Sequence, residues 1–190
     1  GDIVHQEFLG QDIEDGVATF TSLNHWMDEK GEAFLAEERQ FQIRELDEKG
    51  RLQIDMQSKF TPLRGDVYLK GDPEHAGVQF RPANEVERKK TKYIYPDGIL
   101  KIKGKKDLPW VAENFTLAGQ EHGVLILNDP ENPKNTVYSA YRDYGRFGAF
   151  FEKEIKQGES LEVHYGFRIF AGPLPEAKEL QELWKAWSGN

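Results

Sequence analysis

Hydrophobic and polar residues alternate with a period of two along much of the chain. The clearest case is residues 161–169 (LEVHYGFRI), and a second runs through residues 52–57 (LQIDMQ). Successive side chains of a β-strand point to opposite faces, so this alternation predicts strands with one buried and one solvated face. The tetrapeptide Asp-Glu-Lys-Gly occurs at 28–31 and at 47–50, and its composition is typical of a hairpin turn. Residues 17–60 are therefore predicted to form a meander of long strands.

Residues 33–46 also fit a helix, because part of the segment has helical spacing. The residues with this spacing are Phe34, Glu38, Phe41 and Glu45. We favour a strand, since Phe41 and Ile43 keep the two-residue phase up to the following turn. Further along, residues 115–117 and 124–127 are expected to flank a longer hairpin loop.

The end of the chain changes period. After Pro173 and Pro175, the apolar residues fall on one helical face: Ala177, Leu180, Leu183, Trp184 and Trp187. This pattern predicts an amphipathic helix over residues 176–187 that packs on the sheets, with both leucines and both tryptophans buried. Many strands and one helix predict an all-β fold, an antiparallel β-sandwich with a C-terminal amphipathic helix, formed by residues 1–190 as a single domain.

Composition excludes several classes of function. The 190 residues include 25 Lys and Arg against 33 Asp and Glu, a net charge of -8, so we expect neither nucleic acid nor an anionic membrane surface as a partner. No apolar run approaches the roughly 18 residues of a membrane helix. The absence of cysteine removes disulfides, thiolate zinc sites and cysteine nucleophiles. Residues 88–106 are basic, and we expect a solvated loop region there rather than an anion site.

Three segments resemble the PmoA-like family, a bacterial family of unknown function: residues 1–8 (GDIVHQEF), 74–86 (EHAGVQFRPANEV) and 138–151 (YSAYRDYGRFGAFF). The label methane oxygenase that this family often carries does not suit the chain. A membrane copper monooxygenase needs spanning helices and clustered copper ligands, whereas the five histidines here are scattered. The resemblance implies a soluble sandwich similar to the galactose-mutarotase-like supersandwich of sugar-binding proteins, or a large part of one.

The resemblance also bears on the N-terminal end of the domain. Relatives usually carry a histidine-rich stretch before the segment that matches residues 1–8, so we expect this chain to lack an N-terminal portion present in them. Residues 3–8 have the apolar character of a strand inside a sheet. We expect this strand to form an abrupt sheet edge, to associate with another copy in a homo-oligomer, or to border the missing portion.

Residues 74–82 carry the strongest candidate chemistry. A strand there places His75, Gln79 and Arg81 on one face and Val78 and Phe80 on the other, in the core. An imidazole, a carboxamide and a guanidinium about 7 Å apart suit a ligand rich in hydroxyl groups or bearing a carboxylate. An ordinary exposed sheet face is the alternative. With the family resemblance, we assign His75 and Arg81 to catalysis and Gln79 to ligand binding.

The second candidate segment is residues 142–148 (RDYGRFG), in which two glycines permit unusual backbone angles among polar and aromatic side chains. We assign Asp143 to catalysis and Arg142 and Tyr144 to ligand binding, although an internal salt bridge of Arg142 fits the sequence equally well. Three further residues complete the candidate ligand-binding set: Asn84, Trp110, which could stack on a sugar face or border the core, and His25 beside Trp26.

No segment predicts a cofactor or a metal. The histidines lack metal-ligand spacing, residues 128–135 lack the spaced aspartates of a calcium loop, and no nucleotide-binding or Gly-x-Ser-x-Gly motif occurs. The leading hypothesis is a carbohydrate-associated domain acting in glycan catabolism, either an epimerase-like enzyme or a glycoside hydrolase or lyase. A noncatalytic glycan-binding or protein-interaction module is the alternative. A periplasmic or extracellular location is favoured over the cytoplasm.

Overall fold

The computed structural model describes residues 1–46 and 51–189, and these residues form an antiparallel β-structure with one α-helix. The predicted turn at 47–50 lies outside the described residues. The strands are β1 Ile3–Glu14, β2 Val17–Met27, β3 Ala33–Glu45, β4 Leu52–Pro62, β5 Val67–Leu69, β6 Val78–Phe80, β7 Lys92–Ile94, β8 Trp110–Leu117, β9 Gln120–Asn128, β10 Val137–Tyr138, β11 Phe147–Phe150, β12 Lys153–Ile155 and β13 Leu161–Phe170. A 3-10 helix, η1, spans Arg88–Lys90, and α1 spans Ala177–Ser188.

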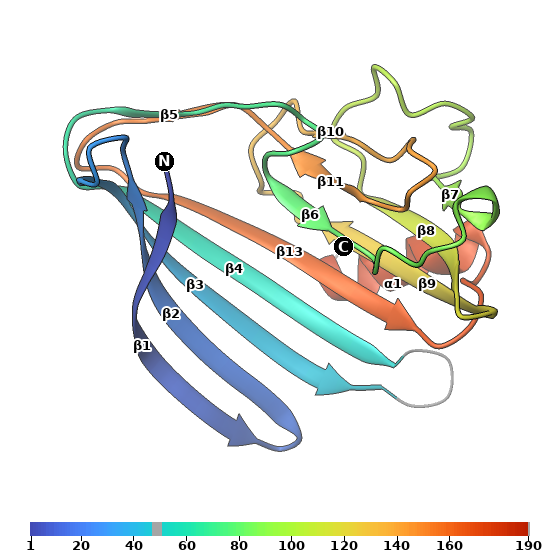
Figure 1. The fold of residues 1–190 in the computed structure, drawn as a ribbon. Coiled ribbons are helices and arrows are strands. Elements are labelled where there is room, and N and C mark those ends of the chain that lie inside the picture. The colour runs from blue at the N-terminus through green and yellow to red at the C-terminus, as the bar shows by residue number, and fades with distance from the viewer. Residues whose placement is uncertain (47–50, 190) are drawn as a thin grey trace.

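One large sheet dominates the fold. Its strand order is β1-β2-β3-β4-β13-β9-β8-β7, with every neighbouring pair antiparallel. A smaller sheet, β10-β11-β6, lies over one face of this sheet, and α1 lies behind the other face (Figure 1). The pair β12-β5 forms a third, short sheet. The predicted all-β class, the strand meander through residues 17–60 and the strand rather than a helix at residues 33–46 are confirmed.

Two-residue turns connect two of the long hairpins. Asp15 and Gly16 join β1 to β2 with φ of 49° and 78°, and Ala118 and Gly119 join β8 to β9 with φ of 51° and 78°. Positive φ at both central residues matches the twist of the flanking strands. The longer loop that we expected between residues 117 and 124 is therefore wrong: Gln120 and the residues after it already pair with β8. Between β9 and β10 the chain forms a loop over residues 129–136.

The main core lies between the large sheet and the smaller sheets. Val111, Ile126 and Tyr165 of the large sheet are fully buried, and so are Phe147 and Ala149 of β11 on the other side. These apolar side chains come from alternate positions of their strands, as the period of two predicts. The core holds the smaller sheet and its connecting loops in a fixed position over the large sheet.

The C-terminal helix covers the opposite face. Leu180 is fully buried, and Leu183, Trp184 and Trp187 are half-buried against β8 and β9. The predicted helix and its packing face are confirmed, but of the four side chains expected to be buried only Leu180 is fully buried. Gly166 on β13 allows the close approach, because a Cβ there would lie 2.8 Å from the ring of Trp187.

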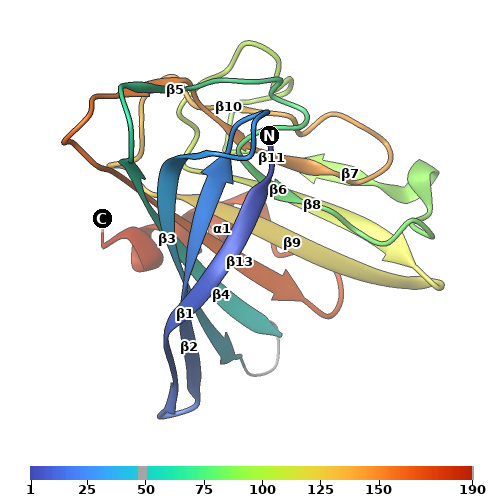
Figure 2. The ribbon, with the colours of Figure 1, turned by 60° about the vertical axis from the view of Figure 1, so that its left-hand side comes forward.

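The N-terminal strand forms one edge of the large sheet, as expected. Among the strands of the described residues, β1 pairs with β2 only, and each residue of β1 is exposed. Figure 2 shows this edge strand beside β2, with the N-terminus near the end of the sheet over which β5 and β10 lie. Among the described residues, no helix is long and apolar enough to cross a membrane.

Candidate functional site

A cavity of about 550 Å³ lies between the large sheet and the segment that precedes β6. We call it the sheet cavity. One wall consists of side chains from β2, β3, β4 and β13, and the other consists of residues 69–70, 75–79 and 150–151. Aromatic side chains supply much of its surface: Trp26, Phe41, Phe60, Phe150, Phe151 and Phe167. The strand alternation explains the sheet wall, because every second residue of each strand faces inward.

A buried carboxylate lies on the sheet wall. Glu37 is 2% exposed, and its two oxygens accept hydrogen bonds from Trp26 Nε1 at 2.9 Å and Ser58 Oγ at 2.7 Å. Arg39, two residues along β3, donates from Nε at 2.9 Å and from Nη2 at 2.7 Å in a bidentate pair. Four donors offset the cost of removing this carboxylate from water. Glu37 thereby fixes the guanidinium of Arg39 at the cavity surface.

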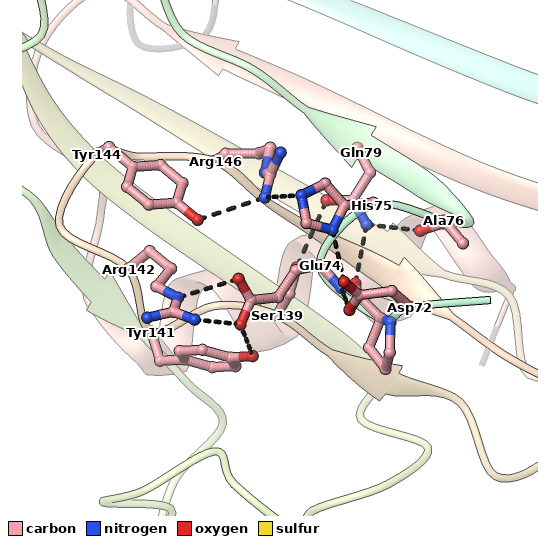
Figure 3. Close-up of polar contacts among 11 residues, drawn as sticks. Asp72, Glu74, His75, Ala76, Gln79, Ser139, Tyr141, Arg142, Tyr144 and Arg146 are labelled. Atoms are coloured by element: carbon pink, nitrogen blue, oxygen red, sulfur yellow. Dashed lines mark hydrogen bonds and ion pairs between the residues drawn. The ribbon is translucent and has the colours of Figure 1, made fainter.

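His75 lies on the opposite wall, in a turn that Asp72 organises (Figure 3). The Asp72 carboxylate accepts the backbone N–H of Glu74 at 2.9 Å and lies 2.6 Å from His75 Nδ1. The pKa of Asp72 lies below its ordinary value. The main cause is the hydrogen bond from the Glu74 N–H, and the second is the hydrogen bond with His75. Arg146 Nη2 lies 3.4 Å from His75 Nε2, and a guanidinium can only donate. A tautomer with its proton on Nδ1 satisfies both contacts, since Nδ1–H donates to Asp72 and Nε2 accepts from Arg146.

A second ion pair holds the loop before β11 against the same turn. Glu74 pairs with Arg142 Nη2 at 2.5 Å and accepts the Tyr141 hydroxyl at 2.7 Å, as Figure 3 shows. Arg142 was predicted to bind a ligand. It instead forms an ion pair that joins the loop before β11 to the turn that holds Glu74. The salt bridge that we considered for Arg142 exists, but its partner is Glu74 and not a neighbour in its own loop.

The predicted strand face at residues 75–81 is only partly present. The strand begins at Val78, because Gly77 takes a φ of 76° and breaks the alternation. A Cβ at Gly77 would lie 2.1 Å from the carbonyl oxygen of Ala149, so the position requires glycine. His75 and Gln79 both line the sheet cavity, but Arg81 does not. Placing His75 and Arg81 on one strand face was therefore wrong.

Three of the predicted residues lie together elsewhere. Arg81, Asn84 and Tyr144 line a separate pocket of about 400 Å³, which we call the arginine pocket. Its lining residues are Arg81, Pro82, Ala83, Asn84, Val86, Arg88, Tyr144 and Arg146. The hydrogen bond between Arg146 and His75 connects this pocket to the sheet cavity.

The remaining predicted site residues lie outside both pockets. Trp110 is fully buried beneath α1, where its Nε1 donates to Gln181 at 2.9 Å, so its assignment to sugar stacking is corrected to a core role. His25 lies within β2 next to Trp26, so its side chain is on the opposite face of the strand, away from the sheet cavity. Asp143 is exposed and lines neither pocket.

Sequence reasoning missed the residues that organise the sheet cavity: Trp26, Glu37, Arg39, Ser58 and Asp72. A signal for two of them was present. Leu35, Glu37, Arg39 and Phe41 share one phase of β3, so charged residues stand where the alternation calls for apolar ones. Burying a charged side chain in a strand lowers the stability of the fold unless the charge is paired, so such a position is a candidate for function.

Comparison with known proteins gives a family and no activity. None of the curated proteins matches the chain at a significant level. Within the part of the chain that the structure describes, no cluster of three or more histidine, aspartate or glutamate side chains could hold a metal ion. The profile of a family of unknown function, DUF6807, matches residues 1–185, which is nearly the whole sequence. The chain therefore belongs to the DUF6807 family of unknown function.

Proposed function

We propose that this chain is a carbohydrate-binding domain that holds a sugar in the sheet cavity. A volume of about 550 Å³ is within the range of small-molecule sites, and an aromatic lining with a few fixed polar groups is typical of them. Aromatic rings offer flat surfaces to the C–H faces of a sugar ring. Polar groups between the rings can bind the hydroxyl groups.

The observation that carries the proposal is the state of Arg39. Its Nε and Nη2 are fixed on the buried Glu37, while its Nη1 makes no hydrogen bond with any described residue. A preorganised guanidinium with free donors among aromatic side chains suits a ligand with many acceptor oxygens. Lys70, His75 and Gln79 add polar groups on the opposite wall.

The His75–Asp72 pair favours an enzyme over a passive binding module. An imidazole whose Nδ1–H is held by a carboxylate can act as a general base through Nε2, where a substrate would take the place of the 3.4 Å contact with Arg146. An epimerase-like reaction, or hydrolysis or elimination at a glycosidic bond, requires such a group. The resemblance to the PmoA-like family and to mutarotase-like sandwiches supports a sugar ligand by analogy of fold alone. A noncatalytic glycan-binding module remains the second candidate, supported by the aromatic lining.

Calorimetric titration with a panel of neutral and acidic mono- and oligosaccharides tests the binding proposal. We expect at least one sugar to bind, His75→Gln to weaken its binding, and His25→Gln to leave it unchanged. His25 is the matched control because it lies in β2 of the large sheet, on the face that points away from the sheet cavity. Absence of binding across the panel, or equal losses in both variants, would overturn the assignment of the sheet cavity.

NMR spectra of the bound sugar over time separate the two candidates. Conversion of the sugar that stops in His75→Gln identifies an enzyme. Binding without conversion identifies a binding module.

A further inference from the structure

The arginine pocket gathers three guanidinium groups that form no salt bridge with a carboxylate of the described residues. Arg81, Arg88 and Arg146 line it, and none of its described lining residues is acidic. No salt bridge forms between these arginines and any described carboxylate. By contrast, four other arginines of the chain are paired with carboxylates: Arg39, Arg44, Arg64 and Arg142. In a chain of net charge -8, three unpaired arginines in one pocket are unusual.

Tyr144 contacts two of the three arginines, Arg88 and Arg146. The guanidinium carbons of Arg88 and Arg146 lie 5.9 Å and 5.4 Å from the centroid of the Tyr144 ring. Arg146 Nη2 also lies 3.3 Å from the Tyr144 hydroxyl. Stacking on an aromatic ring limits the orientations of a guanidinium and leaves its N–H groups free to donate. The like charges are held near one another without an anion between them.

The acidic groups nearest in the chain do not cancel this charge. Glu87 is paired with Lys90 at 2.8 Å, and Glu85 and Asp143 are exposed and outside the lining. Glu113 lies beneath Gly145, where a Cβ would be 2.8 Å from its Oε1. Burial raises the pKa of Glu113 to about 9, so this carboxyl is neutral at pH 7. Arg146 lies near enough to Asp72 to lower the pKa of that carboxyl, but Asp72 is hydrogen-bonded to His75.

We propose that the arginine pocket binds the oxyanion group of a small ligand, a phosphate, a sulfate or a carboxylate. Guanidinium groups match the planar or tetrahedral oxygen arrangement of these anions and bind them through paired N–H donors. Asn84 adds an amide to the same pocket. This inference does not rest on the sugar proposal, because it concerns other residues and another pocket. Of the basic stretch at residues 88–106, the proposed site includes Arg88 and no lysine.

Two double variants of equal charge test the anion site. Arg81→Gln with Arg88→Gln removes two guanidinium groups from the pocket but spares Arg146, which contacts His75. Lys101→Gln with Lys103→Gln removes two exposed charges from the same basic stretch, outside the pocket. All four side chains are exposed, so both proteins should fold, which circular dichroism checks.

Inorganic phosphate, inorganic sulfate, D-glucuronate and D-glucose are then titrated by calorimetry at constant ionic strength. We expect at least one of the three anions to bind, a tenfold or greater loss of affinity in the arginine variant, and no change in the lysine variant. Phosphate or sulfate binding alone identifies an inorganic oxyanion or its ester, and glucuronate binding without glucose binding identifies a carboxylate. Failure of all three anions to bind, or equal losses in both double variants, would overturn the proposal. A loss of glucose binding in the arginine variant with unchanged anion binding would overturn it as well.

Discussion

Trp26 Nε1 donates a 2.9 Å hydrogen bond to Glu37 Oε2 across two neighbouring strands of the large sheet. This bond and those from Arg39 and Ser58 leave both oxygens of the buried carboxylate satisfied. The arrangement requires a negative acceptor, because each of its neighbours donates.

Glu37→Gln should destabilise the protein although it keeps the shape of the side chain. The amide nitrogen would face donors of Arg39 or Trp26 and leave a buried donor without an acceptor, which costs about 2 kcal/mol. Urea denaturation measures the change in the free energy of unfolding. Glu38→Gln, at the next and exposed position of β3, is the control and should change it by less than about 0.5 kcal/mol. Equal effects of the two substitutions would contradict the role of Glu37.

Asp72 should stabilise the protein only above acidic pH. Its folded pKa lies below the ordinary 3.8, because the Glu74 N–H and His75 bind the ionised form. An acid with a lowered folded pKa stabilises the fold above its unfolded pKa and loses that contribution as pH falls through the folded value. Wild type should therefore exceed Asp72→Asn in stability at pH 7, and the difference should vanish as the pH falls below 3.8.

Unfolding curves from pH 7 down to pH 3 follow this difference. Asp97→Asn is the control, at an exposed position without a hydrogen bond to the described residues. A difference for Asp72→Asn that is constant with pH would mean that ionised Asp72 has no special partners.

Glu113 should make the protein less stable as pH rises. Neither of its oxygens has a hydrogen-bond partner among the described residues, and burial raises its pKa to about 9 from an ordinary 4.5. Between these two values the folded state holds a proton that the unfolded state has released. The free energy of unfolding then falls by at most about 1.4 kcal/mol per pH unit.

Glu113→Gln removes this titration but keeps the size of the side chain. Its stability relative to wild type should rise steadily when unfolding is measured at pH 6, 7 and 8. Glu121→Gln, an exposed substitution on the neighbouring strand β9, should show no such trend. A parallel pH dependence of wild type and Glu113→Gln would mean that Glu113 is ionised in the folded protein.

The sequence predicts the elements of this protein better than it predicts their junctions. Residues 161–169 alternate because one face of β13 meets the core and the other meets solvent or α1, and this requirement is visible in the sequence alone. The alternation at residues 75–81 looks similar, yet the chain turns at Gly77. The sequence does not show whether a glycine takes a positive φ or an extended strand conformation. It therefore could not exclude a strand that places His75 and Arg81 on one face.

Long-range contacts explain the remaining errors. Trp110 alternates like a core residue, but whether it faces a ligand or a helix depends on where α1 packs, almost 70 residues later. Arg142 was assigned to ligand binding, with a salt bridge in its own loop as the alternative, whereas Glu74 pairs with it from a distant turn. Charged residues in the core phase of β3 were the one readable signal of the sheet cavity.

β1 should mediate self-association of the protein at high concentration. This edge strand exposes five apolar side chains: Ile3, Val4, Phe8, Leu9 and Ile13. Its outer backbone groups pair with no strand of residues 1–46 or 51–189, which favours pairing with a second copy. Leu9→Lys should lower the dimer fraction in sedimentation velocity at rising concentration. Leu100→Lys removes a residue that is 92% exposed in a loop and should leave the fraction unchanged. A purely monomeric wild type would contradict this expectation.

Gly77→Ala tests whether the turn before β6 places His75 in the sheet cavity. A Cβ at residue 77 would lie 2.1 Å from the Ala149 carbonyl oxygen, on a backbone with a φ of 76°, so the strand pair β6–β11 must separate or the turn must change. Gly65→Ala has a similar φ of 65° with no atom within 4 Å, so it measures the backbone strain alone. We expect a loss in unfolding free energy of about 1 kcal/mol for Gly65→Ala and about 3 kcal/mol for Gly77→Ala.

The two variants also separate a local effect from a general one. If the turn positions His75, Gly77→Ala should shift the NMR signals of the His75 ring under conditions where the protein is still folded, and Gly65→Ala should not. The backbone carbonyl oxygen of Asp72 accepts the N–H groups of His75 and Ala76. A change of φ at residue 77 should therefore move the His75 imidazole through this turn. Unchanged His75 signals in a destabilised Gly77→Ala protein would mean that Asp72 alone holds the imidazole, and that the glycine serves only the pairing of β6 with β11.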